Sequence, residues 1–120
     1  MNYKMEKTIN KPNFNIGIDV TKIDYFVNKS DKFIKRLLTD NEYNQYLKID
    51  NNLKPRFLAS RWALKEATFK AINEFHKIFF INIEFIKNDN NSYTCTTFKN
   101  VKVSISYDGN QVFATAIYLN

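Results

Sequence analysis

The sequence predicts one α+β domain, in which an antiparallel sheet packs around a single long central helix. Near the start, apolar residues alternate strictly with other residues, as they do in a strand. In the middle, residues 54–74 contain no glycine and only one proline, close to their start, which is typical of a long helix. After this helix, short runs rich in β-branched and aromatic residues are separated by turn residues, which indicates further strands.

The first strand is predicted over residues 14–20. Its apolar side chains share one face, formed by Phe14, Ile16, Ile18 and Val20. Asp19 falls on the opposite face, together with Asn15 and Gly17. Because Gly17 has no side chain, it leaves room beside the acid.

Three helices follow, over residues 28–36, 40–49 and 54–74. The second is preceded by Thr39, which suits an N-cap, and Glu42 three residues later completes a capping box. Pro55 fits the first turn of the third helix, where its missing N–H costs no hydrogen bond.

The remaining strands are predicted over residues 80–87, 92–98, 101–106 and 111–119. A polar turn at 88–91 separates the first two, and Asp108-Gly109-Asn110 is a strong hairpin signal before the last. Residues 112–119 carry apolar side chains on both faces. This pattern suits either a strand at an interface between subunits or a strand buried on both sides within one subunit.

The composition limits the kinds of partner and cellular compartment that fit this chain. The chain has 120 residues and a net charge of +6, which favours acidic partners, nucleic acid included. Residues 1–13 are polar and basic, so we expect a loose arm before a domain at 14–120, and neither a signal peptide nor a membrane span. Cys95 is the only cysteine, which excludes an internal disulfide and favours a reducing compartment, the cytoplasm.

The long helix carries an unusual number of charges among apolar residues: Arg61, Lys65, Glu66 and Lys70. Burying unpaired charge is costly, so these side chains need a charged ligand, a metal or internal partners. Two interpretations stay open. The helix forms the wall of an ion-binding site, or its charges reach the surface and pair at i,i+4.

Asp19 and Glu66 together suggest a metal site. An acid on a strand and an acid on a helix, each beside small residues, could form a two-carboxylate cradle for a hard divalent cation. Magnesium usually takes one or two protein carboxylates and fills its other positions with water and phosphate oxygens. Lys70, one turn beyond Glu66, could then meet a phosphate as a point charge.

Four segments resemble the small phosphopantetheinyl transferases, in particular the holo-acyl-carrier-protein synthase type. They are 17–20 (GIDV), 38–42 (LTDNE), 57–71 (FLASRWALKEATFKA) and 103–108 (VSISYD). The segments follow the family's order at roughly its spacing and span nearly everything from Asn15 to the C-terminus. The third segment is the most specific of the four.

The resemblance implies an enzyme that moves the phosphopantetheine arm of coenzyme A to a serine of apo acyl carrier protein, a step that serves fatty acid and lipid biosynthesis. Asp19 and Glu66 would hold magnesium against the pyrophosphate, and Arg61 and Lys70 would meet coenzyme A phosphates. The base for the serine would be Glu66 or a water on the metal. The resemblance also implies a homotrimer with active sites between subunits.

This chain departs from the family in three places. Tyr107 stands where a histidine near the coenzyme A phosphates is usual, so Ser106 and Tyr107 are expected to contact coenzyme A without an imidazolium charge. A glycine-rich turn after Ala71 is missing. Asp24-Tyr25 replaces a basic carrier-binding residue, and the contact must be rebuilt from other cations, for which the candidates are Lys22, Lys29, Lys32, Lys35 and Arg36.

A second hypothesis is a non-catalytic basic module that binds RNA or the carrier protein alone, with a degenerate active site. The aromatic residues fall mostly at core-facing positions and no glycine-aromatic RNA motif is present, which favours the transferase without nucleic acid as a partner. Lys65 points about 140° away from Lys70 around the helix, so we expect it to matter less for the nucleotide.

Overall fold

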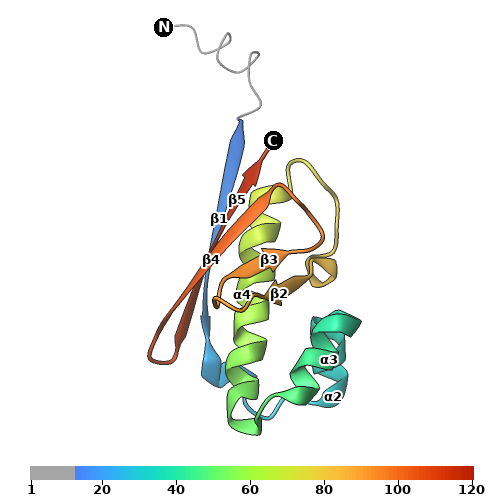
Figure 1. The fold of residues 1–120 in the computed structure, drawn as a ribbon, viewed down its shortest axis with the longest axis vertical. Coiled ribbons are helices and arrows are strands. Elements are labelled where there is room, and N and C mark those ends of the chain that lie inside the picture. Colours follow the sequence, from blue (N-terminus) through green and yellow to red (C-terminus); the bar gives the residue numbers. More distant parts are fainter. Residues whose placement is uncertain (1–12) are drawn as a thin grey trace, which may run out of the picture.

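The computed structural model describes residues 13–120, so all but the last residue of the expected arm at 1–13 lies outside the described residues. Three long strands form an antiparallel sheet in the order β1-β5-β4: β1 (Phe14–Lys22), β4 (Val101–Asp108) and β5 (Gln111–Leu119). The long helix α4 (Lys54–Ile72) lies across one face of this sheet (Figure 1). This arrangement confirms the predicted fold class.

The strand pairing fixes the position of Asp19. β1 pairs with β5 along its whole length, from Phe14 opposite Leu119 to Lys22 opposite Gln111. The predicted hairpin joins β4 to β5, and Gly109 adopts a φ of 57° in its turn. Asp19 therefore lies opposite Ala114, near the middle of an edge strand.

The faces of β1 are unusual. Its apolar face points away from the helix, and the side chains that form it are 51–59% exposed: Phe14, Ile16, Ile18 and Val20. The inward face carries Gly17, Asp19 and Thr21 instead. A Cβ atom on Gly17 would lie 2.9 Å from the backbone nitrogen of Ala71, so the room beside Asp19 is filled by α4 itself.

The other helices pack beside α4. Ser30 caps α2 (Asp31–Leu37), and the predicted capping box of Thr39 and Glu42 begins α3 (Asp40–Lys48). Short 3-10 helices cover Ile23–Phe26 and Asn51–Leu53, where the sequence predicted none. Pro55 lies in the first turn of α4 as expected. The helices α2, α3 and α4 lie on one side of the three-stranded sheet (Figure 1).

The strand expectations for residues 80–98 were too long. Phe80–Asn82 is a 3-10 helix, and the second sheet contains only β2 (Phe85–Lys87) and β3 (Tyr93–Cys95). The ladder stops at Glu84 because its N–H binds the side-chain hydroxyl of Thr97, at 2.8 Å, instead of a carbonyl on the facing strand.

Cys95 is buried, and burial raises the pKa of its thiol. Among the described residues, no helix is long and apolar enough to cross a membrane.

Candidate functional site

Asp19, Glu66 and Lys70 come together where β1 crosses α4. The ammonium of Lys70 lies 3.6 Å from Asp19 Oδ1 and donates a hydrogen bond to the carbonyl of Ile18 at 2.9 Å. The hydroxyl of Thr21 donates to Asp19 Oδ2 at 2.5 Å. Glu66 and Lys70 lie one turn apart on the same side of the helix. The close packing at Gly17 brings the strand and the helix near enough for these contacts.

The two acids affect each other. Burial raises the pKa of Glu66, the negative charge of Asp19 raises it further, and Lys70 opposes both effects. Two carboxylates that repel in this way are stabilised by a cation between them. Their donor atoms are all oxygens, which suits magnesium.

The cluster fits a cation that keeps most of its coordination for other ligands. Within residues 13–120, no group of three or more His, Cys, Asp or Glu side chains could enclose a metal. If a metal binds here, Asp19 and Glu66 would supply its carboxylate ligands, and phosphate oxygens and water could fill the remaining positions.

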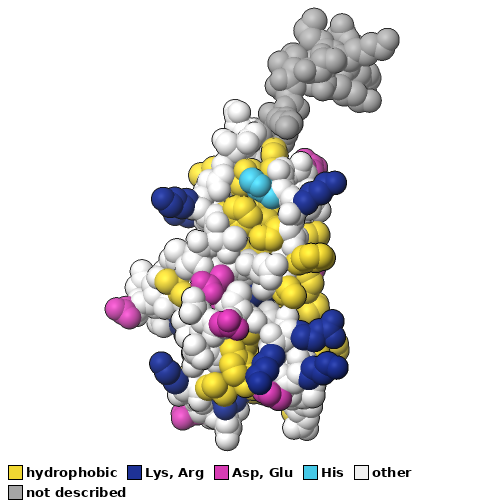
Figure 2. Space-filling model, turned by 90° about the vertical axis from the view of Figure 1, so that its right-hand side faces the viewer, with side chains coloured by type: hydrophobic (Ala, Val, Ile, Leu, Met, Phe, Trp, Pro, Cys, Tyr) yellow, Lys and Arg dark blue, Asp and Glu magenta, His cyan; other side chains and the backbone are white. Residues whose placement is uncertain are grey.

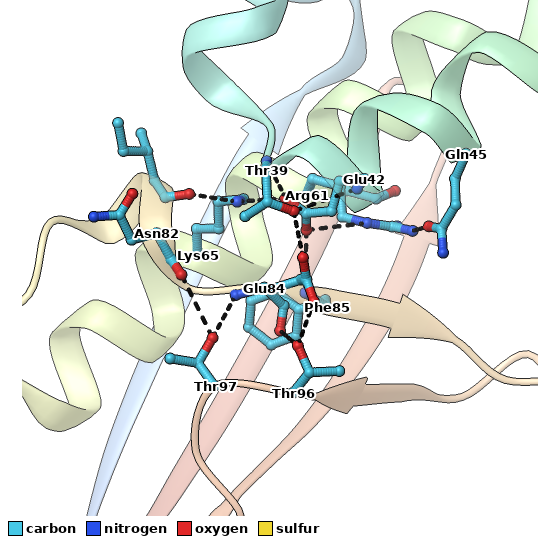
Figure 3. A network of polar contacts seen from close by, with 12 residues as sticks. Thr39, Glu42, Gln45, Arg61, Lys65, Asn82, Glu84, Phe85, Thr96 and Thr97 are labelled. Atoms are coloured by element: carbon cyan, nitrogen blue, oxygen red, sulfur yellow. Dashed lines mark hydrogen bonds and ion pairs between the residues drawn. The ribbon is translucent and has the colours of Figure 1, made fainter.

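Arg61 and Lys65 belong to a different cluster. Both are at most 1% exposed, and both face Glu42, which is fully buried (Figure 3). Lys65 Nζ lies 2.6 Å from Glu42 Oε1 and also donates to the carbonyl of Ile81 at 2.9 Å. Arg61 Nε lies 3.6 Å from Glu42 Oε2. The surface pairing at i,i+4 is therefore wrong for these two residues.

Glu42 holds this cluster together. Its carboxylate accepts hydrogen bonds from the backbone N–H of Thr39 at 3.0 Å and of Phe85 at 3.1 Å, in addition to its two ion pairs (Figure 3). Burial lowers the pKa of Lys65, and the charge of Glu42 opposes this. The four charges of α4 that stand out in the sequence thus serve two purposes: Arg61 and Lys65 bind Glu42 of α3, and Glu66 and Lys70 face Asp19.

The two expected coenzyme A contacts on β4 lie on opposite faces of the sheet. Ser106 is exposed on the outer face, opposite Phe113, and Tyr107 is half-buried on the inner face. The Tyr107 hydroxyl lies 2.7 Å from Ser60 Oγ. Ser60 Oγ donates its own proton to the carbonyl of Arg56 at 2.7 Å, so Tyr107 is the donor in the shared bond.

Tyr107 lines a pocket of about 490 Å³ at the start of α4. Arg56, Arg61, Lys87 and Tyr93 contribute to its walls. The buried guanidinium of Arg61 lies over the rings of Phe57 and Tyr93, at 4.2 and 4.9 Å. The spacing of Arg56 and Ser60 on one helix could have been found from the sequence. The approach of Tyr93 from another strand carried no sequence signal.

Apart from Ser106, which lies on the outer face of the sheet, the predicted site residues form two groups within one copy of the chain. Asp19 lies on β1 and Tyr107 on β4, at opposite edges of the sheet with β5 between them. Lys70 belongs to the first group and Arg61 to the second.

Comparison with known proteins identifies the family. A family model described as the 4′-phosphopantetheinyl transferase superfamily matches residues 15–116, most of the chain. The chain belongs to the 4′-phosphopantetheinyl transferase superfamily. Two relatives in this superfamily, each named holo-[acyl-carrier-protein] synthase, come from Mycoplasma mobile and Mycoplasma genitalium. They are 41% and 42% identical to the chain, over 85% and 87% of its length and 86% and 92% of theirs.

Solved structures of the same superfamily agree with the fold. A holo-(acyl-carrier-protein) synthase from Bacillus anthracis, in complex with CoA (3′,5′-ADP), matches with a TM-score of 0.75 at 30% identity, over 87% of this chain and 94% of that one. A Helicobacter pylori synthase in complex with coenzyme A gives a TM-score of 0.64 at 26% identity, over 84% and 96%. The family, the fold and the transferase class expected from the sequence are confirmed.

Proposed function

We propose that the chain transfers the phosphopantetheine arm of coenzyme A to a serine of apo acyl carrier protein, releasing adenosine 3′,5′-bisphosphate. The observation that carries this proposal is the convergence of Asp19, Glu66 and Lys70 at one crossing of strand and helix. The superfamily match and the coenzyme A complexes of relatives support it.

Each residue of the cluster has a role in this chemistry. Asp19 and Glu66 would hold magnesium, which supplies Lewis acidity to the pyrophosphate when bound. Lys70 lies beside them with its side chain about half exposed, so its ammonium can reach a phosphate and stabilise the charge that develops on the leaving oxygen. Thr21 fixes the orientation of Asp19 through its hydroxyl. Positioning and charge neutralisation are the main contributions that phosphoryl transfer needs from a protein.

We also propose that the active form is a homotrimer. The outer face of the sheet exposes the apolar side chains of β1 together with Ile117 and Leu119 of β5, at 39% and 48%. No part of residues 13–120 covers this face. Its burial against other copies would remove apolar surface from water. Assembly would also bring the Asp19 group of one copy to the Tyr107 group of another, as the family resemblance implies.

The carrier protein would bind beside α2. Lys32, Phe33 and Arg36 line a groove of about 580 Å³ together with Trp62 and Phe80. Figure 2 looks onto this side of the molecule, where Lys and Arg side chains lie next to hydrophobic ones. Such a surface suits an acidic amphipathic helix.

The candidate cations for carrier binding are not equivalent. Lys35 is engaged by Asp31 at 3.2 Å, and Lys29 lies 3.8 Å above the Tyr25 ring. Lys32 and Arg36 are therefore the best placed to contact the carrier.

The cytoplasm is the compartment we propose, because the substrates are coenzyme A and a carrier protein and because Cys95 is a free buried thiol.

The test is the intact mass of an apo acyl carrier protein incubated with the protein, coenzyme A and magnesium. We expect the mass to rise by one phosphopantetheine. No increase with several carriers, combined with an increase for Tyr107→His, would favour the non-catalytic binding module. Steep loss of RNA binding between low and moderate salt would be the signature of the nucleic-acid alternative.

A further inference from the structure

Phe79 is the most exposed of the large apolar side chains among residues 13–120, at 76%. It does not belong to the sheet, because it lies in the segment between α4 and β2, directly before the 3-10 helix at Phe80–Asn82. A single exposed apolar residue is common on protein surfaces. Phe79 differs from such residues because a groove lies on each side of it.

The backbone that carries Phe79 is held in place by its neighbours. The ring of Phe80 packs edge-on against Trp62, with 5.2 Å between the ring centroids. The carbonyl of Ile81 accepts a hydrogen bond, at 2.9 Å, from the fully buried ammonium of Lys65. An apolar side chain on such a support loses little conformational freedom when a partner covers it, which favours binding.

The two grooves meet at Phe79 and Phe80, which line both of them. The first is the groove beside α2 that we assign to the carrier protein. The second has a volume of about 500 Å³ and is lined by Phe69 and Asn73 at the end of α4 and by residues 76–78. Phe79 therefore forms the ridge between two neighbouring hollows of one surface.

Both grooves carry positive charge and no negative charge. Lys32 and Arg36 line the first and Lys77 lines the second, and neither groove has an acidic residue in its lining. None of the ion pairs among residues 13–120 involves these three cations. A second copy of the same surface would be repelled, whereas an acidic helix with one apolar face would be attracted.

The grooves also lie next to the proposed metal site. Trp62 of the first groove is four residues before Glu66, and Phe69 of the second is three residues after it. The helical period places all three side chains on one side of α4. A partner that spans both grooves therefore passes beside Glu66, where the acceptor serine is needed.

We propose that Phe79 is a specificity-determining residue for the carrier protein. Its ring packs into the apolar face of an acidic carrier helix that lies across both grooves. This inference rests on the proposed function. It also explains how the chain binds a carrier although Asp24-Tyr25 stands where the resemblance predicts a basic contact: an apolar contact at Phe79 replaces part of the missing charge.

The test measures carrier binding separately from transfer. Calorimetry is done with the assembled protein and an apo acyl carrier protein whose acceptor serine is replaced by alanine. Phe79→Ala should weaken binding by about tenfold or more, as truncation of an interface anchor does, and Phe79→Leu should retain most of it. With the unaltered carrier, Phe79→Ala should raise the KM for the carrier and leave kcat and the KM for coenzyme A within about twofold.

Two further variants serve as controls. Leu47→Ala removes a side chain that is also apolar and 53% exposed but lies on α3 and lines neither groove, so it should change carrier binding by less than about twofold. Arg36→Ala should weaken binding less as salt is added, because salt screens exposed charges, whereas the effect of Phe79→Ala should persist.

The outcomes distinguish this inference from the function beneath it. Weaker carrier binding in Phe79→Ala, with Leu47→Ala unchanged, supports the proposal. Equal effects of the two variants, a change in coenzyme A affinity instead, or loss of assembly of Phe79→Ala in sedimentation would overturn it. If the wild type binds a carrier but modifies none, the proposed function has failed, and the dependence of that binding on Phe79 still decides the inference. Absence of binding to any carrier would overturn both.

Discussion

Gly17 and Ala67 are in backbone contact: a Cβ atom on Gly17 would overlap the carbonyl oxygen of Ala67. The strand that carries Asp19 therefore touches the helix that carries Glu66 without any side chain between them. No other residue type allows this approach, because even alanine would push the two elements apart.

Gly17→Ala should lower the free energy of unfolding by about 1–3 kcal/mol, the usual effect of forcing an extra group into a packed interior. The separation of Asp19 from Glu66 should reduce transfer further, beyond what the unfolded fraction explains. Urea unfolding and the rate of carrier modification, measured on the same preparation, test both parts. Unchanged stability would mean that strand and helix do not touch here.

Asp19→Ala and Glu66→Gln should each abolish transfer and leave a folded, assembled protein, since each change relieves repulsion between the acids. Transfer assays with a chelator-treated wild type and circular dichroism of the variants are the measurements. Full activity of either variant, or of the wild type in chelator, would exclude these residues as the metal site.

The pH dependence of stability should reveal Glu66 when no metal is present. Burial and the charge of Asp19 raise the pKa of Glu66, so the folded protein holds this proton more tightly than the unfolded chain. Stability should therefore fall as pH rises from the ordinary glutamate pKa through the raised one. In urea titrations with chelator, the free energy of unfolding of the wild type should rise relative to that of Glu66→Gln as the pH is lowered. A constant difference between them would contradict the shift.

Lys70→Ala should weaken coenzyme A binding by about tenfold or more, from the loss of a charged hydrogen bond of about 1.5–3 kcal/mol. Calorimetry measures this directly. The matched control is Lys48→Ala, an exposed lysine at the end of α3, which should have little effect. Equal losses in the two variants would point to general electrostatics instead of a phosphate contact.

Lys65 is unsuitable as that control, although its direction around the helix favoured it. Its ammonium is fully buried against Glu42, and Lys65→Ala would leave that carboxylate with Arg61, at 3.6 Å, as its one cationic partner among the described residues. Breaking a buried pair in this way should cost about 3–5 kcal/mol. Thermal unfolding tests the value, and a loss within about 0.5 kcal/mol, typical of surface positions, would show that the pair is not buried.

Much of the site was predictable because it depends on short-range geometry. The alternation of β1 assigns Asp19 to one face, and the helical period sets Glu66 and Lys70 side by side, so their meeting required only that the strand cross the helix. The partner of Lys65 was not predictable, since Glu42 lies 23 positions away and was already explained as a capping residue. The contact of Arg56 with the Tyr107 ring, at 3.6 Å, was not predictable either, because a helix residue and a residue of a later strand are brought together only by the tertiary fold.

If the apolar outer face of β1 is an interface between copies, the stability of this protein should depend on its own concentration. β1 is an edge strand, and four of its large apolar side chains are more than half exposed in a single copy. If this face is covered by other copies, dilution removes that cover, and both the melting temperature and the activity per molecule should fall together. Ile18→Asp should prevent assembly at every concentration, and sedimentation should then detect only the monomer. A newly made copy would then be inactive until it meets others.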